Sequence, residues 1–386
     1  MKILYITTDW NTPHRIATGE YGGIGYYRAH GPAKALRAKG HKVDVFGVEL
    51  KEKIDEDNVF ESYMELVKPY DIVIIKQADT ANVAKLIGAC KEQKVPIAMD
   101  LDDLITELDP DNPATQKGYE EGGTKQAFAV AGLSMVDALF VSTEPLADEY
   151  HKFLKLKLQA KVPIYILPNC CDPTLWTQRK RLEDDQAIIG WQGSITHDND
   201  LKIVLPTLRK LMTKHKNLSL SFTGGIQQET YDSVFKKTFT KEQLERIAVL
   251  MGTPSFKGFP EFLSRHQWDI GIIPLRDTKF SRGKSHIKWL ENSLIGVCSI
   301  ASDVFPYREP IQGTPVIQDA TTGILCKDDE WEEKLSFLIE SKNQRKYIAR
   351  DARKFVLENW TYTKHIHKWE EAFASVIRKG SKSLRT

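Results

Sequence analysis

The chain has 386 residues, of which 41% are hydrophobic and 27% are charged, and its formal net charge is +2. This length is too great for one ordinary hydrophobic core and predicts two domains. The near-neutral charge excludes a strong general binder of polyanions, and the lack of a long apolar run excludes a predicted transmembrane helix.

The N-terminus and the cysteines predict the compartment. The first residues, MKILYITTDW, lead directly into a strand and lack the pattern of a signal peptide. The five cysteines are odd in number, and the adjacent pair Cys170 and Cys171 suits neither metal ligation nor a usual disulfide. We therefore expect a cytoplasmic protein.

The first half alternates predicted strands and helices. Apolar segments predict strands at 2–10, 40–48, 70–76, 95–103, 138–144 and 162–172, with helices at 81–93 and 145–154. A strand, a loop with Gly22, Gly23 and Gly25, a helix and a second strand are the opening of a doubly wound α/β domain. These glycines do not match the dinucleotide fingerprint GxGxxG, but they would let the backbone approach a ligand closely; a mobile surface loop is the alternative.

Charged residues follow the glycine loop and the fourth predicted strand. Arg28 lies just inside the helix after the loop, where it could contact a charged substrate group or solvent. Asp100, Asp102 and Asp103 lie at the carboxyl end of a strand, which is where open α/β sheets bind ligands. Alternatively, these aspartates close the loop after the strand or cap the start of the next helical segment, without a functional role. We predict a catalytic role for Asp102 and acceptor-binding roles for Arg28, Asp100 and Asp103.

Two further segments of the first half are candidate binding regions. The acidic segment 107–123 predicts a long loop, and such loops often bind ligands. The run HKFLKLKLQAK at 151–161 places lysines among apolar residues, and it could face anionic lipid, nucleic acid or only solvent. The sequence does not interleave basic and aromatic residues, so it gives no support for sequence-specific nucleic-acid binding. Saccharide, lipid and modified DNA remain open as acceptors, as does peripheral membrane contact.

The second half repeats the α/β pattern after a highly charged segment at 177–185, where we place the domain boundary. The predicted domains are 1–178 and 185–360, followed by a closing helix and tail at 361–386. Strands are expected at 187–194, 218–225, 268–275 and 298–303. Helices are expected at 200–215, 241–251, 259–267, 330–341, 343–359 and 363–379.

The segment 280–303 predicts a short helix followed by a buried strand. Ser285 is the expected N-cap, and Gly296 is the expected stop. Ile287, Leu290 and Leu294 recur at helical spacing and predict one apolar stripe that faces a core.

A second stripe of this helix is charged. Lys284, Lys288 and Glu291 follow one another at helical spacing, and Arg282, Gly283 and Lys284 lie at the expected helix start. Free N–H groups, a flexible glycine and two cations would bind a phosphate well. A solvated face with a Lys288–Glu291 surface pair is the alternative.

In their order, these segments resemble the GT-B glycosyltransferases, most closely family 4 of the retaining enzymes. The resemblance covers nearly the whole chain and is carried by PNCCD, by KGFPEFLSRHQWDIGIIPL, by IKWLENSLIGVCSIASDVFPYREPI with the later TGILC, and by HKWEEAF. It implies an α/β fold of two Rossmann-like domains facing each other across a cleft, with the C-terminal helix packing back toward the N-terminal domain. It also implies a UDP- or GDP-linked sugar as co-substrate, transfer with retention, and neither a metal nor a cofactor.

The resemblance assigns donor contacts to the second domain and one loop of the first. Glu291 would bind the ribose, and Arg282, Lys284 and Lys288 would lie near the diphosphate. The remaining donor-binding residues would be Gly22 and Gly23 in the closing loop, Gly193 and Ser194 beside the diphosphate, and Gly258 and Phe259 beside the base.

The chain departs from the family pattern at three places. Gly283 occupies the position of the first of two glutamates, Asp102 that of a frequent histidine, and WQGSITHDNDLK lacks the usual cationic pair. We therefore predict that Arg282 and Lys284 are catalytic and stabilise the charge of the leaving diphosphate. Three alternatives are a metal-dependent transferase with Asp100 and Asp102 as a DxD motif, a non-catalytic nucleotide-sugar binding protein, and a Rossmann oxidoreductase.

Overall fold

The computed structural model describes residues 1–7, 21–47, 53–76, 80–112, 118–178, 186–226 and 228–383. Contacts divide the chain into two units. The first comprises 1–171, 283–285 and 362–386, and the second comprises 172–282 and 286–361. The last helix therefore groups with the first unit, and most of the predicted boundary segment lies outside the described residues.

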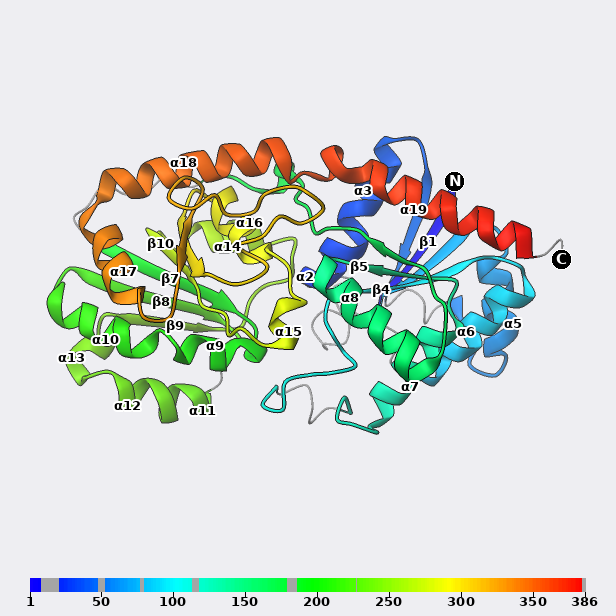
Figure 1. Cartoon of the computed structure of the whole chain (residues 1–386), viewed down its shortest axis with the longest axis horizontal. Coiled ribbons are helices and arrows are strands. Elements are labelled where there is room, and N and C mark those ends of the chain that lie inside the picture. Colours follow the sequence, from blue (N-terminus) through cyan, green and yellow to red (C-terminus); the bar gives the residue numbers. More distant parts are fainter. Residues whose placement is uncertain are drawn as a thin grey trace. The chain divides into compact units, whose positions relative to one another are not determined.

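The first unit contains a parallel sheet of six strands in the order β2-β1-β3-β4-β5-β6 (Figure 1). Strands β1, β3, β4 and β5 are buried almost throughout, as expected for a sheet covered by helices on both faces. All six were expected from their apolar runs. Their bounds are β1 (Lys2–Thr7), β2 (Lys42–Phe46), β3 (Ile72–Lys76), β4 (Ile97–Leu101), β5 (Ala138–Val141) and β6 (Ile164–Ile166).

The helices of the first unit connect these strands, and the last of them returns from the end of the chain. They are α2 (Gly23–Gly25), η1 (Tyr26–His30), α3 (Gly31–Ala38), α5 (Val59–Val67), α6 (Ala81–Glu92), α7 (Thr124–Met135), α8 (Glu144–Phe153), η3 (Leu154–Leu158) and α19 (Tyr362–Ser383).

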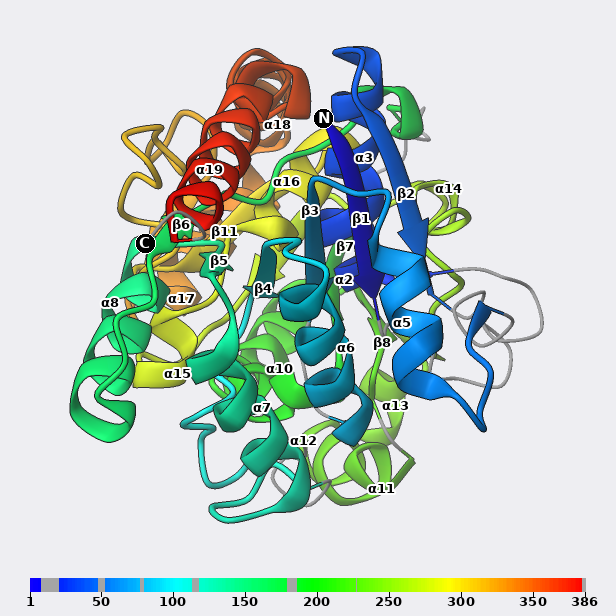
Figure 2. The ribbon, with the colours of Figure 1, turned by 90° about the vertical axis from the view of Figure 1, so that its right-hand side faces the viewer.

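Helix α19 packs on the first sheet through aromatic residues (Figure 2). The ring of Phe373 lies 5.4 Å from that of Phe140 on β5 and 6.4 Å from that of Tyr5 on β1. At the start of the helix, a Cβ on Gly31 would lie 2.4 Å from the ring of Tyr362. Because real side chains do not approach so closely, the glycine is what allows α3 and α19 to pack together.

The second unit also contains a six-stranded parallel sheet, in the order β12-β11-β10-β7-β8-β9 (Figure 1). This order reverses between β7 and β10, and such a switch point is where doubly wound sheets bind ligands. The strands are β7 (Ala187–Gly193), β8 (Leu218–Gly224), β9 (Ile247–Met251), β10 (Ile270–Ile273), β11 (Cys298–Ser302) and β12 (Ile324–Cys326).

Thirteen helical segments accompany this sheet in the described residues. They are η4 (Pro173–Leu175), η5 (Ile195–His197), α9 (Asp198–Lys202), α10 (Leu205–Lys214), α11 (Gln228–Thr230), η6 (Tyr231–Phe235), α12 (Lys236–Thr238), α13 (Lys241–Leu244), α14 (Phe259–Ser264), α15 (Lys279–Arg282), α16 (Ile287–Leu294), α17 (Trp331–Glu340) and α18 (Lys342–Asn359).

Several expectations for the second unit are wrong in detail. The helix expected at 241–251 ends at Leu244, and its second half is β9, which pairs with β8. The helix expected at 200–215 is two helices, α9 and α10. Ser285 is not the N-cap of α16, because that position belongs to His286, so Lys284 precedes the helix. Gly296 does end it, with a left-handed φ of +77°.

Two glycines let helices and aromatic side chains reach the second sheet. A Cβ on Gly190 of β7 would lie 1.9 Å from the Trp268 ring, and a Cβ on Gly271 of β10 would lie 2.3 Å from the amide nitrogen of Asn292 on α16. Since either contact is impossible for a larger residue, Gly190 makes room for the Trp268 ring and Gly271 allows the close approach of α16 to the sheet.

Two findings concern the cysteines and the longest helices. All five cysteines are buried and none forms a disulfide. Within the described ranges, none of the helices combines the length and apolar character that a membrane crossing requires.

Candidate functional site

Polar residues of the second unit gather at the switch point of its sheet. Gln192 and Gly193 end β7, and Arg276 follows β10, the neighbouring strand. Ser302 ends β11, and its hydroxyl accepts the backbone N–H of Leu275 at 2.9 Å, which holds the chain after β10 in place. The carboxyl ends of these strands therefore form the floor of a candidate ligand site.

Helix α16 brings Glu291 to this site. Its carboxylate is 5% exposed and accepts a hydrogen bond from the side-chain amide of Gln192. Lys288 lies three residues earlier and so on the same side of the helix. A buried carboxylate next to a lysine at a switch point can bind hydroxyl groups and an anion at once.

Asp200, in α9, links η5 to the segment that follows β10. Its carboxylate accepts from Nδ1 of His197 at 2.8 Å and from the backbone N–H of Arg276 at 3.0 Å, and the Arg276 Nε lies 3.5 Å away. Burial alone would raise the pKa of Asp200, but the hydrogen bond and charge of His197, with Arg276 and Lys288, hold it below its usual value. The carboxylate is therefore ionised at neutral pH.

Tyr307 borders the same group. Burial, followed by the nearby charges of Asp200 and Glu291, raises its pKa well above the ordinary value. The phenol is consequently a hydrogen-bond donor at every physiological pH.

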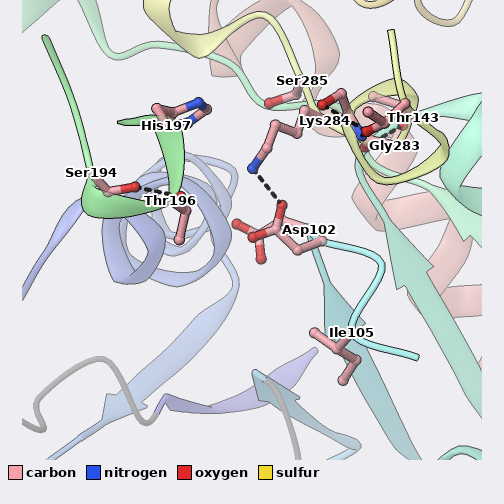
Figure 3. A network of polar contacts seen from close by, with 12 residues as sticks. Asp102, Ile105, Thr143, Ser194, Thr196, His197, Gly283, Lys284 and Ser285 are labelled. Atoms are coloured by element: carbon pink, nitrogen blue, oxygen red, sulfur yellow. Dashed lines mark hydrogen bonds and ion pairs between the residues drawn. The ribbon is translucent and has the colours of Figure 1, made fainter. Parts of the chain in front are cut away.

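The predicted donor-binding residues occupy different parts of the second unit. Gly193 and Ser194 follow directly from Gln192, and the Ser194 hydroxyl lies 2.7 Å from that of Thr196 (Figure 3). Gly258 precedes α14, whose first residue, Phe259, is buried with its ring 6.4 Å from that of Trp176. The role of Gly258 and Phe259 beside the base stays a prediction.

Arg282 is exposed and engaged within the second unit. Its Nε and NH2 donate to the two carboxylate oxygens of Asp277 at 2.6 and 2.8 Å. These hydrogen bonds, followed by the charge of Asp277, raise the pKa of the Arg282 guanidinium above its ordinary value. The guanidinium is therefore always charged, and its predicted catalytic role remains a prediction.

In the first unit, Arg28 and Asp100 form a buried pair. The Arg28 Nε and NH2 donate to the two oxygens of Asp100 at 2.7 and 2.9 Å, and NH1 donates to the carbonyl of Leu167 at 2.6 Å and to Asn169 at 2.9 Å. Arg28 and Asp100 are each 1% exposed. The pair links β4 to the segment after β6 and does not present a charge at the surface, which favours a structural role over acceptor binding.

The next two aspartates lie at the end of β4 with a lysine each. Asp102 pairs with the buried Lys76 of β3, and Asp103 lies 3.3 Å from the ammonium of Lys284. Burial alone would raise the pKa of Asp102, but Lys76, Arg28 and Lys284 lower it. Figure 3 shows Lys284 directed toward the Asp102 loop.

The segment 283–285 is anchored to the first unit by neutral hydrogen bonds as well. The Thr143 hydroxyl donates to the carbonyl of Gly283 at 3.0 Å, and the side-chain amide of Asn169 donates to the Ser285 hydroxyl at 2.7 Å. Of the glycine loop, Gly22 is the N-cap of α2 and Gly23 is its first residue, and residues 8–20 lie outside the described ranges. The structure thus brings Asp102, Asp103 and Lys284 together, and separately Gly193, Lys288 and Glu291.

The pairing of the aspartates bears on the DxD alternative. Asp100 and Asp102 each accept from a buried cation, so a metal ion would have to displace Arg28 and Lys76. Among the described residues, no group of three or more His, Cys, Asp or Glu has metal-binding geometry.

Sequence reasoning missed Lys76, Gln192, His197, Asp200 and Arg276. Three of them could have been found, because Lys76, Gln192 and Arg276 lie at or just after the carboxyl ends of expected strands. His197 and Asp200 carry no such signal, since their pairing depends on the geometry of η5 and α9.

Two doubly wound units of this kind give the chain the fold of the GT-B glycosyltransferases. Similar solved structures include an alpha-glucosyltransferase in complex with UDP and a 13-mer DNA containing an HMU base, with a TM-score of 0.68, 12% identity, and 97% of this chain and 99% of that chain covered. Anabaena Alr3699/HepE in complex with UDP gives a TM-score of 0.61 at 12% identity, covering 97% of this chain and 100% of that chain. A glycosyltransferase from Rickettsia africae ESF-5 gives 0.63 at 13%, with 97% and 99% covered.

No protein-family model and no curated protein sequence matches the chain. The predicted GT-B resemblance is confirmed for the fold, and membership of family 4 remains a prediction.

Proposed function

We propose that the chain is a glycosyltransferase that moves a hexose from a UDP-linked donor to an acceptor, with retention and without a metal ion. The observation that carries the proposal is the buried carboxylate of Glu291, held by Gln192 at the switch point of the second sheet. The GT-B fold supports it, as do two of the similar structures, an alpha-glucosyltransferase and Anabaena Alr3699/HepE, which are both in complex with UDP-glucose.

The second unit would hold the nucleotide. Glu291 would accept hydrogen bonds from the ribose hydroxyls, because an ionised acceptor makes the strongest bonds to such donors. Lys288 and Arg276 would face the diphosphate, with Asp200 orienting the Arg276 backbone and side chain. These cations would stabilise the charge that develops on the diphosphate as the glycosidic bond breaks.

The first unit would hold the acceptor. The Asp102–Lys76 and Asp103–Lys284 pairs offer acceptors and donors of hydrogen bonds at the carboxyl ends of β3 and β4. An ionised Asp102 suits the binding of a hydroxyl group that becomes the nucleophile. A saccharide, a lipid and hydroxymethylated DNA all carry such a group, and a panel of the three as acceptors would identify the class.

The donor is tested by thermal denaturation with UDP, GDP, ADP and CDP at matched concentration. UDP should raise the melting temperature most, because only a ligand of the folded state stabilises it. Glu291→Gln should weaken UDP binding about 10-fold or more, the value of a hydrogen bond to a charged group, whereas Glu332→Gln at an exposed position of α17 should leave binding unchanged. Equal shifts with all four nucleotides would contradict the proposal.

The reaction is tested by donor hydrolysis and transfer with and without EDTA. Activity that survives EDTA supports the metal-free step, and loss of activity restored by Mg²⁺ or Mn²⁺ would overturn it. UDP binding without turnover on any acceptor would instead identify a non-catalytic sugar-nucleotide binding protein.

A further inference from the structure

A cavity of about 730 Å³ lies in the first unit at the amino ends of β5 and β6. Asp137 and Pro163, which line it, directly precede these two strands. Because Asp102 follows the carboxyl end of β4, which is parallel to β5, the cavity is at the opposite edge of the same sheet. It is therefore separate from the acceptor site proposed above.

The wall of this cavity is basic. Lys155 and Lys161 from the segment after α8, Lys379 near the end of α19, and His151 all line it. Lys155, Lys161 and Lys379 are exposed, and none of them makes an ion pair with a carboxylate in the described part of the chain. The single acid of the wall, Asp137, accepts the backbone N–H of Ile97 at 2.9 Å.

The floor of the cavity is apolar, and an exposed leucine lies beside it. Leu154, Val162 and Val376 line it and are buried. Leu156, between Lys155 and Lys157, is 72% exposed, the largest exposed fraction of any large hydrophobic residue in the described ranges. In Figure 2 the end of α19 lies next to β6, and the Tyr165 hydroxyl of β6 donates to that of Ser375 on α19 at 2.8 Å. Val376 and Lys379 of α19 line the cavity from this side.

We propose that this cavity binds the headgroup of an anionic phospholipid and docks the first unit on a membrane surface. Three lysines without carboxylate partners attract an anion, and the apolar floor accepts the glycerol and first methylenes of a lipid. Leu156 would enter the interfacial layer while the lysines around it stay at the phosphates. Duplex DNA presents its phosphates at the surface and keeps the faces of its bases stacked inside, so it offers far less apolar surface than a lipid for this floor or for Leu156, and the observations favour lipid.

The proposal is tested by co-sedimentation of the full chain with vesicles. Vesicles with 30% phosphatidylglycerol should bind the protein, and pure phosphatidylcholine vesicles should not. The triple variant Lys155→Gln, Lys161→Gln and Lys379→Gln should bind about 100-fold more weakly, at about fivefold for each lysine near an anionic surface. A matched control, Lys39→Gln, Lys85→Gln and Lys91→Gln, changes the same charge at exposed sites of the first unit outside the cavity and should bind like the wild type.

Two further variants separate the cavity from charge alone. Ala160→Trp fills the cavity and keeps every charge, so it should lower binding to phosphatidylglycerol vesicles at least fivefold. Leu156→Gln should lower it severalfold through the lost apolar insertion. Equal losses in the control triple variant, no effect of Ala160→Trp, or tighter binding to duplex DNA than to vesicles would each overturn the proposal. Glycosyl transfer in solution tests the proposed function independently of this result.

Discussion

Replacement of Arg28 by methionine should destabilise the first unit without altering any surface charge. The substitution leaves the buried Asp100 carboxylate without its bidentate partner and removes the donor that serves the Leu167 carbonyl and Asn169. Breaking a buried ion pair by removal of one partner costs about 3–5 kcal/mol. For a unit of about 200 residues this corresponds to a melting temperature lower by about 6–20 °C.

The measurement is calorimetric melting of wild type and variant, with Arg37→Met as the matched control. Arg37 lies in α3 at an exposed position, and its guanidinium donates to the carbonyl of Val43, so its loss should cost less than about 1 kcal/mol. The melting temperature of the double variant Arg28→Met with Asp100→Asn should fall less than that of Arg28→Met alone, because this variant leaves neither charge of the pair buried without its partner.

One result would refute this reasoning. If Arg28→Met melts within about 2 °C of the wild type and instead raises the KM for the acceptor, the guanidinium serves the acceptor site that the sequence predicts, and the buried pair is not structural.

Three further predictions concern other residues. Because the pKa of Asp200 is lowered in the folded protein, its ionised form stabilises the second unit at pH values above its unfolded pKa of about 3.9, and this stabilisation is lost as the pH falls through the folded pKa. In urea unfolding at pH 6, Asp200→Asn should therefore have a lower free energy of unfolding than the wild type, and this difference should be smaller at pH 3. A difference that stays constant between the two pH values would contradict the assignment. Gly190→Ala places a Cβ 1.9 Å from the Trp268 ring and should lower the free energy of unfolding, measured in urea, by about 1–3 kcal/mol or more. Gly258→Ala, whose Cβ would have its nearest contact at 3.6 Å, should change this free energy by less than about 0.5 kcal/mol. Lys284→Ala tests the role that the sequence predicts for this lysine, stabilisation of the leaving diphosphate: turnover should fall about 100-fold with the melting temperature nearly unchanged, and near-normal donor hydrolysis would leave Lys284 only its pairing with Asp103.

The sequence predicted the strands well because their signal is local. Segments such as YDIVIIK are short, apolar and bounded by polar residues, and β3 forms there. The same rule failed at IAVLM, which continues a helical pattern from Lys241 but forms the edge strand β9, because pairing with β8 outweighs local propensity. It also missed β12, whose three residues are too few for any periodicity.

The candidate site was only partly predictable. The position of Glu291 on a short helix followed by a strand was correct, since its apolar stripe is visible in the sequence. Arg28 and Asp100 looked like ligand-binding residues because the sequence cannot show that side chains 72 positions apart neutralise each other inside a core. His197 was missed for a related reason, as its partner Asp200 acts only through the turn between η5 and α9.

The return of α19 to the first sheet has a consequence for biosynthesis. Tyr5 and Phe140 leave the ribosome long before Phe373, which covers them. Until translation reaches that helix, the nascent first sheet has an exposed apolar face that chaperones would have to cover. A fragment ending at residue 171 should consequently be prone to aggregation, and a stable recombinant piece would need residues 362–383 supplied by circular permutation or by co-expression.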